Sequence, residues 1–288
     1  MTSGNLALHF DASLAAAAHQ QDRLMAELNF ARGLCELYPD KAPRWRRLIG
    51  RAEKAARGIP AGCSVTVLKK KVREAEEIMQ PIGKAAKRHV LHCVGDGHIS
   101  MNSMLSWPES VSITLDTART VLRLMDEYPQ FHYSQSQASV YHIIERHDPE
   151  LLGRIRDRVG EGRWEVTASH WVENDKNMVS GESLCRHLLY TRKYMQKLFG
   201  LSPEDVSIDW APDTFGHAAT IPMYLARGGV NHYYCCRPKD EGTPAPGLFR
   251  WEGPDGSSVL VRKDAYFYNC ILTPGLGQRA LDFMKQTG

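Results

Sequence analysis

The chain has 288 residues, of which 43% are hydrophobic and 24% are charged, a composition typical of a globular protein with one or two domains. This composition excludes an intrinsically disordered or collagen-like chain. No apolar run approaches the roughly 20 residues that span a bilayer. The first residues also lack a basic segment followed by an apolar one, so we expect no membrane segment and no export signal.

Seven cysteines are scattered along the sequence, and none of them forms a C-x-x-C pair. An odd and irregularly spaced set is typical of reduced thiols rather than of a disulfide framework. The cysteine pattern therefore favours a cytoplasmic location.

The net charge of +3 hides an uneven distribution, because residues 41–90 carry a net charge of +10 and the remaining residues carry −7. A basic stretch can bind nucleic acid, and a steep loss of affinity with salt would reveal such binding. Here the charges fall at helical spacing, and Trp45 is the one aromatic side chain of the stretch that could stack on a base. A solvated helical face is the favoured interpretation, and we expect no nucleic-acid partner.

The first 86 residues predict an all-α segment. Segments rich in Ala, Leu and charged residues over 14–37, 42–57 and 67–79 are separated by breaks that contain Pro or Gly. None of them resembles a chemical site, so we assign residues 1–86 to a helical N-terminal region and residues 87–288 to a second domain.

From residue 89 onward, short β-branched or aromatic runs alternate with amphipathic helices. This alternation predicts parallel strands in a layered or barrel α/β fold. The predicted strands are 89–94, 131–134, 163–167, 206–211 and 232–235, and the predicted helices are 112–128, 139–146, 149–161, 182–199 and 218–227. Residues 248–262 then predict a hairpin around the turn 253–256.

Polar segments follow three of the predicted strands, over 95–100, 169–175 and 212–217. The carboxyl ends of parallel strands carry the ligand sites of such folds, so these histidines and carboxylates could form a metal or acid/base site. Each residue also has a plainer interpretation. Asp213 could cap the following helix, His98 could be a hydrogen-bonded structural residue, Glu173 and Asp175 could orient loops, and Arg237 could form a loop ion pair.

These segments resemble the α-mannosidases of glycoside hydrolase family 38. Gly97-His98-Ile99 is similar to the first zinc-binding segment of that family, and residues 210–217 resemble the segment that carries its nucleophile. The family also has segments that are similar in amino-acid sequence and in spacing to residues 162–166, 171–175 and 180–184. The resemblance rests on the occurrence of these segments in order, over about residues 89–262.

The resemblance implies retaining hydrolysis of terminal α-mannosides on a seven-stranded β/α barrel, assisted by one zinc ion (Zn2+). Asp213 would be the nucleophile and a zinc ligand, and His98 would be another zinc ligand. Phe215 would contact the sugar, and Arg237 matches the position of an active-site arginine. In such chemistry a second carboxyl group, about 5 to 5.5 Å away, protonates the leaving oxygen.

Two departures from the family affect this chemistry. Ser100 stands where the family has an aspartate ligand, while Ser103 and Leu105 stand where it has tryptophans. A neutral hydroxyl is a poorer zinc ligand than a carboxylate. The family's other zinc-binding histidine and its general acid have no matching residue here, so we expect a barrel truncated at its C-terminus, in a fragment or a decayed copy of such an enzyme.

Two other functions remain open. A non-catalytic remnant of such an enzyme would bind carbohydrate or a partner subunit without turnover. A metal-dependent carbohydrate deacetylase would release acetate, but the H-x-x-x-H motif of such enzymes has no convincing candidate here. A carbohydrate is the expected partner in the favoured interpretation, and a homo-oligomer is also open.

Overall fold

The computed structural model describes residues 12–57, 63–101, 103–237, 247–264, 268 and 270–287. Helices and mostly parallel strands give the chain a mixed α/β fold, as the alternation predicted. The chain divides into two compact units, Met1–Leu91 with Asn269–Gly288 and His92–Tyr268. The boundary predicted from the sequence lies between residues 86 and 87 instead, and that prediction assigned the last residues to the second domain.

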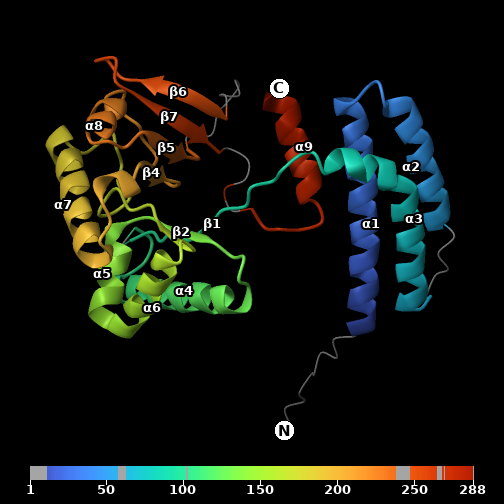
Figure 1. Ribbon diagram of the computed structural model, residues 1–288, viewed down its shortest axis with the longest axis horizontal. Helices are drawn as coiled ribbons and strands as arrows, with labels where there is room; N and C mark the ends of the chain where they lie inside the picture. The colour runs from blue at the N-terminus through green and yellow to red at the C-terminus, as the bar shows by residue number, and fades with distance from the viewer. Residues whose placement is uncertain are drawn as a thin grey trace, which may run out of the picture. The chain divides into compact units, whose positions relative to one another are not determined.

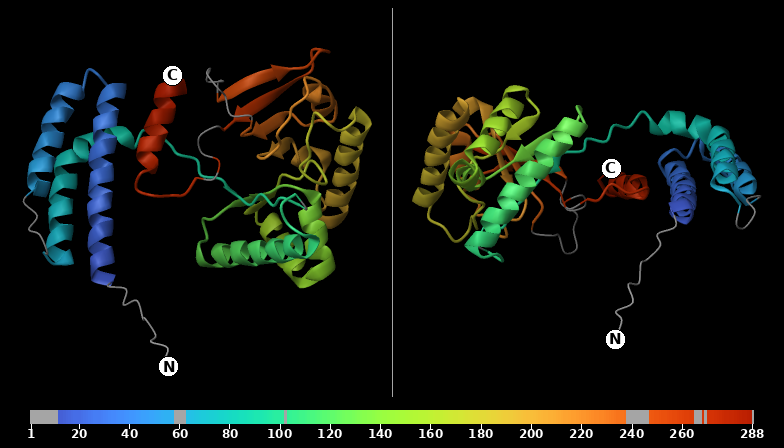
Figure 2. Two further views of the ribbon diagram at one scale, coloured as in Figure 1. Left: turned by 180° about the vertical axis from the view of Figure 1, so that it is seen from behind. Right: turned by 90° about the horizontal axis from the view of Figure 1, so that it is seen from below.

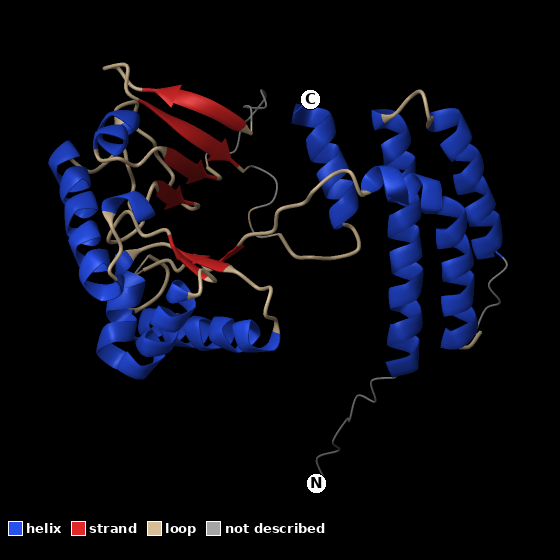
Figure 3. Cartoon of the chain, in the orientation of Figure 1, coloured by secondary structure: helices blue, strands red, loops and turns tan. Residues whose placement is uncertain are grey.

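The first unit is made of helices (Figures 1 and 3). They are α1 (Ala12–Leu37), α2 (Ala42–Arg57), α3 (Val65–Ala86) and α9 (Leu276–Thr287). Helix α9 lies beside α1 in both Figures 1 and 2, and its Leu281 is buried in the core of this unit. A Cβ atom at Gly33 would lie 2.7 Å from Leu281 Cδ1, so the glycine permits this close approach.

Local sequence sets the ends of these helices. Ser64 caps α3, because its Oγ accepts a hydrogen bond from the Val67 backbone N–H at 3.4 Å. The helix continues through Pro81 to Ala86, beyond the predicted end at residue 79. Among the helices that the structure describes, none has both the length and the apolar character needed to cross a membrane.

The second unit begins with a three-stranded parallel sheet in the order β1-β2-β3, with helices α4, α5 and α6 packed around it (Figure 1). The elements are β1 (Gly95–Asp96), α4 (Trp107–Glu127), β2 (Tyr133–Gln135), α5 (Ala138–His147), α6 (Pro149–Gly160) and β3 (Trp164–Val166). Helix α4 begins earlier than predicted because Ser106 and Glu109 form a capping box, with the Ser106 N–H donating to Glu109 Oε2 at 2.7 Å.

The strand predicted over residues 89–94 is wrong. These residues form exposed coil, with Val90 75% exposed and Val94 61% exposed, and β1 begins only at Gly95. An apolar run forms a strand where a neighbouring strand and a covering layer bury it. Residues 89–94 instead cross the boundary between the two units, and all six are exposed.

A second sheet has the order β4-β5-β7-β6. Strands β4, β5 and β7 are parallel, and β6 pairs antiparallel with β7 as the predicted hairpin, whose turn holds Gly256 at a φ of 80°. The elements are α7 (Gly181–Phe199), η1 (Pro203–Asp205), β4 (Ile208–Ala211), α8 (Ile221–Arg227), β5 (His232–Cys235), β6 (Leu248–Glu252) and β7 (Ser258–Lys263).

The described strands form two sheets within the second unit, one of three strands and one of four (Figure 2). No strand ladder joins β3 to β4 in the part of the chain that the structure describes, although a single parallel bridge pairs Lys176 with His217. The seven-stranded barrel therefore stays a prediction. The two sheets nevertheless bring the loops after β1, β3, β4 and β5 together.

Candidate functional site

Four loops that leave the carboxyl ends of parallel strands contribute to one cluster of side chains. His98 follows β1, Glu173 follows β3, Asp213 follows β4 and Arg237 follows β5. Parallel α/β folds carry their ligand sites at this edge of the sheet. The structure therefore brings His98, Asp213 and Arg237 together, as the sequence predicted, and it adds Glu173 to them.

His98 lies between two carboxylates. Its Nδ1 is 2.8 Å from Glu173 Oε2, and its Nε2 is 3.7 Å from Asp213 Oδ2 and 3.1 Å from Ser100 Oγ. Burial lowers the pKa of His98, but Glu173, Asp213 and Asp96 outweigh burial and raise that pKa above its usual value. The carboxylates around His98 thus favour its protonated form.

Asp213 is held by contacts to its backbone and to its side chain. Its backbone N–H donates to Glu173 Oε1 at 2.5 Å, and its Oδ1 accepts a hydrogen bond from Arg237 Nε. The following helix begins at Ile221 after Thr220, so Asp213 is not an N-cap. Its side chain is 23% exposed, which leaves the carboxylate accessible to a ligand.

Phe215 lies beside this ion pair. The Arg237 guanidinium is 4.6 Å from the centre of the Phe215 ring, and the ring is 67% exposed. The cluster therefore offers a ligand a carboxylate acceptor, guanidinium donors and an apolar face, which is the mixture typical of small-molecule sites.

Asp96 is a further carboxylate next to the cluster, and the sequence pattern did not single it out. Burial raises the pKa of Asp96 to about 6, although Trp210 and His98 partly oppose this effect. Its Oδ1 has no hydrogen-bond partner among the described residues. A buried carboxyl group with a raised pKa is more frequent at functional sites than elsewhere.

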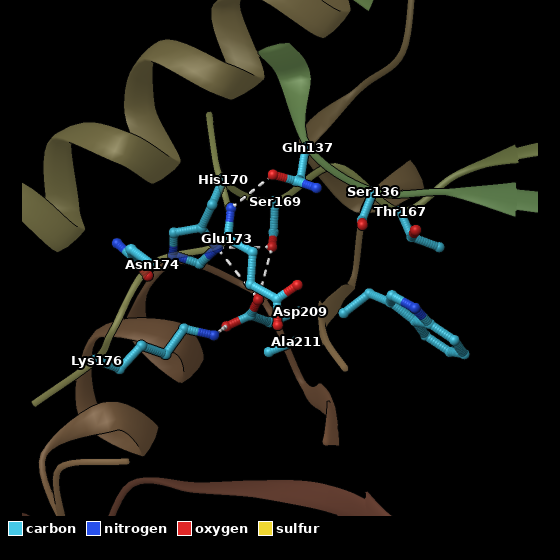
Figure 4. Close-up of a pocket in the computed structure, with 11 residues that line it drawn as sticks. Ser136, Gln137, Thr167, Ser169, His170, Glu173, Asn174, Lys176, Asp209 and Ala211 are labelled. Atoms are coloured by element: carbon cyan, nitrogen blue, oxygen red, sulfur yellow. Dashed lines mark hydrogen bonds and ion pairs between the residues drawn. The ribbon is translucent and has the colours of Figure 1, made fainter. Parts of the chain in front are cut away.

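A second group of charged side chains surrounds a cavity that has room for about one water molecule (Figure 4). Lys176 Nζ lies 2.6 Å from Asp209 Oδ2, and both side chains are buried. Ser169 Oγ donates to Asp209 Oδ1 at 3.0 Å, and His170 Nδ1 lies 3.2 Å from the same oxygen. Burial raises the pKa of Asp209, but His170 and Lys176 hold it well below its usual value.

Glu173 connects this cavity with the His98–Asp213 cluster, because it lines the cavity and contacts both residues of the cluster. The suggestion that Glu173 and Asp175 orient loops agrees with their contacts, since Asp175 Oδ1 also accepts the backbone N–H of Asn177 at 2.8 Å. Glu173 Oε1 in addition accepts the hydroxyl of Thr214 at 3.0 Å.

Sequence reasoning missed the buried pair of Lys176 and Asp209. One signal could have revealed it, because Asp209 is the only charged residue of strand β4 and lies on the same buried face as Ala211. A charged side chain on the buried face of a strand needs a partner. The sequence did not indicate Lys176 as that partner, because the pairing depends on the tertiary contact between the loop after β3 and strand β4.

The donor set expected for zinc is incomplete in the described part of the chain. Protein zinc sites use three or four protein ligands. His98 Nε2 and Asp213 Oδ2 are suitable donors, and Ser100 adds a neutral hydroxyl. No group of three or more His, Cys, Asp or Glu side chains among the described residues could hold a metal ion. Arg237 and Glu173 already contact the other donor atoms of Asp213 and His98. Zinc therefore does not fit these residues.

Two curated proteins of known sequence show how far the similarity extends. Alpha-mannosidase G of Dictyostelium discoideum is 35% identical over 170 residues, which cover 58% of this chain and 15% of that protein. Alpha-mannosidase 2C1 of Homo sapiens is 30% identical over 176 residues, which cover 60% of this chain and 17% of that protein. The chain thus spans about one sixth of the length of these relatives.

A solved structure shares the fold. The alpha-mannosidase from Enterococcus faecalis V583 aligns with a TM-score of 0.53 and 20% identity, covering 60% of this chain and 20% of that chain. Residues 88–286 also match the profile described as the Glycosyl hydrolases family 38 N-terminal domain. Because this match covers more than half of the chain, the protein belongs to glycoside hydrolase family 38.

Proposed function

We propose that the His98–Asp213 cluster is the sugar site of an α-mannosidase-type glycoside hydrolase that acts on terminal α-mannosides. The observation that carries this proposal is the position of Asp213, whose partly exposed carboxylate follows β4 and lies beside His98. Family membership and the names of the relatives support the choice of α-mannosides as the substrate class.

The proposed reaction is retaining hydrolysis with Asp213 as the nucleophile. A retaining enzyme forms a bond between a carboxylate oxygen and the anomeric carbon as the glycosidic oxygen leaves with a proton, and water then breaks that bond. Asp213 Oδ2 is the oxygen suited to attack, because Oδ1 accepts a hydrogen bond from Arg237. Arg237 orients Asp213 through its side chain, and Glu173 orients it through its backbone N–H. The exposed Phe215 ring can contact the sugar.

A second candidate function is carbohydrate binding without hydrolysis. The retaining reaction needs a second carboxyl group that can donate a proton. Glu173 contacts Asp213, but its oxygens are occupied by the Asp213 N–H, the Thr214 hydroxyl and His98. This arrangement favours a site that holds a mannoside and does not cleave it.

Two measurements on the 288-residue chain separate these candidates. The first is release of p-nitrophenol from p-nitrophenyl α-mannoside, and the second is calorimetric binding of methyl α-mannoside. Hydrolysis that Asp213→Asn abolishes supports the enzyme, and an α-configured first product supports retention. Binding without release, weakened by Asp213→Asn and unaffected by the exposed Asp116→Asn, supports the binding function. The absence of both signals would reject both candidates.

We also propose that the protein works in a reducing compartment such as the cytoplasm. The seven cysteines all lie in the described residues and no disulfide joins them, and reduced thiols are typical of such a compartment. Fractionation of cells that express the tagged chain would test this location, and recovery of the chain from a secretory compartment would contradict it.

A further inference from the structure

Three carboxylates around the candidate site, Asp96 not among them, share one feature, because a basic side chain of the same chain lies against each of the three. The three pairs are Arg237 Nε with Asp213 Oδ1, His98 Nδ1 with Glu173 Oε2, and Lys176 Nζ with Asp209 Oδ2. Burial of carboxylates without partners would carry a large free-energy cost. The chain therefore supplies, from its own side chains, the positive charge that these carboxylates need.

Arg237 occupies the side of Asp213 that a second metal contact would use. Asp213 Oδ2 lies 3.7 Å from His98 Nε2, and the other described side-chain contact of that nitrogen is the neutral hydroxyl of Ser100, 3.1 Å away. Two charged or imidazole donors rarely retain zinc.

We infer that this chain binds its sugar without a divalent metal ion, and that Arg237 is the cation that holds Asp213 in the ligand-binding position. The inference rests on the proposed function for the identity of the ligand. A neutral sugar needs no metal to be recognised at this cluster. Its hydroxyls can donate to Asp213 Oδ2 and accept from the N–H groups of Arg237, and its apolar face can cover the exposed ring of Phe215.

Two substitutions should open the site to zinc by different routes. Ser100→Asp places a carboxylate near His98 Nε2, where it completes a set of three donors with His98 and Asp213. Arg237→Met frees Asp213 Oδ1 for a second metal contact. Ser103→Asp is a matched control for the first change, because Ser103 is exposed on the same loop. Arg250→Met is the control for the second, because Arg250 is exposed on β6.

The experiment titrates zinc into the chelator-treated full chain by calorimetry, and it separately measures methyl α-mannoside affinity with EDTA and with zinc. We expect weak zinc binding by the unmodified chain and by both controls, and equal mannoside affinity in the two conditions. The combined Ser100→Asp and Arg237→Met variant should bind zinc at least about tenfold more tightly, by the scale on which changes around metal ligands act. Circular dichroism checks that each variant is folded. If Arg237→Met does not fold, the Ser100→Asp single variant still tests the inference.

The outcomes separate the inference from the proposed function. One zinc ion bound tightly by the unmodified chain, with a gain in mannoside affinity, would overturn the inference and leave the sugar site intact. Folded variants that gain no zinc affinity would also overturn it, because Arg237 and Ser100 would then not exclude the metal. If no mannoside binds in either condition, the proposed function fails, and the zinc titrations alone decide whether the chain excludes the metal.

Discussion

Glu173 Oε2 lies 2.8 Å from His98 Nδ1, and the other oxygen of the same carboxylate accepts the backbone N–H of Asp213. One buried side chain, 6% exposed, therefore touches both residues to which the family resemblance assigns zinc binding. Glu173 follows β3, so its carboxylate connects that loop with the loops after β1 and β4. We interpret Glu173 as a positioning residue for the cluster.

Glu173→Gln should lower the pKa of His98, because the substitution keeps the shape of the side chain and removes a charge that raises that pKa. A histidine whose pKa is raised by folding adds stability below its unfolded pKa, and this contribution is lost as the pH rises through the folded value. The variant should therefore lose more stability at about pH 6 than at about pH 9. NMR titration of His98 and urea unfolding at both pH values would measure these effects.

Glu182→Gln is the matched control for this prediction. Glu182 pairs with Arg186 on the exposed surface of α7, where its side chain is 70% exposed. Its removal should leave the His98 titration unchanged and shift stability little. An unchanged pKa of His98 in Glu173→Gln would show that Glu173 does not control the imidazole.

Asp96→Asn should stabilise the protein at neutral pH. Burial raises the pKa of Asp96 to about 6, so the folded state binds a proton more tightly than the unfolded state and stability falls as the pH rises from about 4 to about 6. The amide removes this cost and should increase the free energy of unfolding at about pH 7 by up to about 3 kcal/mol.

Urea unfolding as a function of pH checks the Asp96 prediction. The advantage of Asp96→Asn should shrink as the pH falls from about 6 to about 4, because protonation then removes the charge from the wild-type side chain as well. Asp116→Asn is the control, because that side chain is 71% exposed and its charge is already solvated. A stability difference that is constant with pH would contradict the assigned cause.

Much of the α/β unit could be predicted, because its helices carry apolar residues at helical spacing and its strands lie between turn-forming residues. The hairpin over residues 248–262 was also predictable, since a Gly-Pro-Asp-Gly turn separates its two strands. The run over 89–94 was not, because its apolar composition is that of a strand and its exposure depends on the boundary between the units. Local sequence does not encode that boundary.

The convergence of His98, Asp213, Phe215 and Arg237 could be predicted, because the first three lie in segments that resemble the family and Arg237 follows the next strand end, at the position of an active-site arginine. Their chemical roles stay predictions. The partners of these residues were harder to foresee. Glu173, Lys176 and Asp209 meet their partners across 33 to 75 residues of sequence, so their pairing depends on tertiary packing rather than on a local pattern.

Lys176→Met should destabilise the protein by about 3 to 5 kcal/mol, because it leaves the buried carboxylate of Asp209 without its cation. The Lys176→Met/Asp209→Asn double variant should recover most of this loss, since the uncompensated charge is then gone. A double-mutant cycle by urea unfolding measures the coupling between the two side chains.

Arg227→Met is the control, because Arg227 is 71% exposed in its pair with Asp255, and its loss should cost less than about 1 kcal/mol. Equal losses in the buried and exposed pairs would contradict the prediction.

Gly97→Ala should destabilise the loop that carries His98. A Cβ atom at Gly97 would overlap Tyr133 Oη and would lie 3.3 Å from Thr117 Cγ2. Tyr133 cannot move away easily, because it is buried and its hydroxyl donates to Gln135 Oε1 at 2.8 Å. Overpacking of this kind costs about 1 to 3 kcal/mol, which urea unfolding can measure.

Gly153→Ala in α6 is the matched control, since nothing lies within 4 Å of its Cβ position and alanine favours the helix. A Gly97→Ala variant as stable as the wild type would show that the loop adapts, and that the position of His98 does not depend on this close contact.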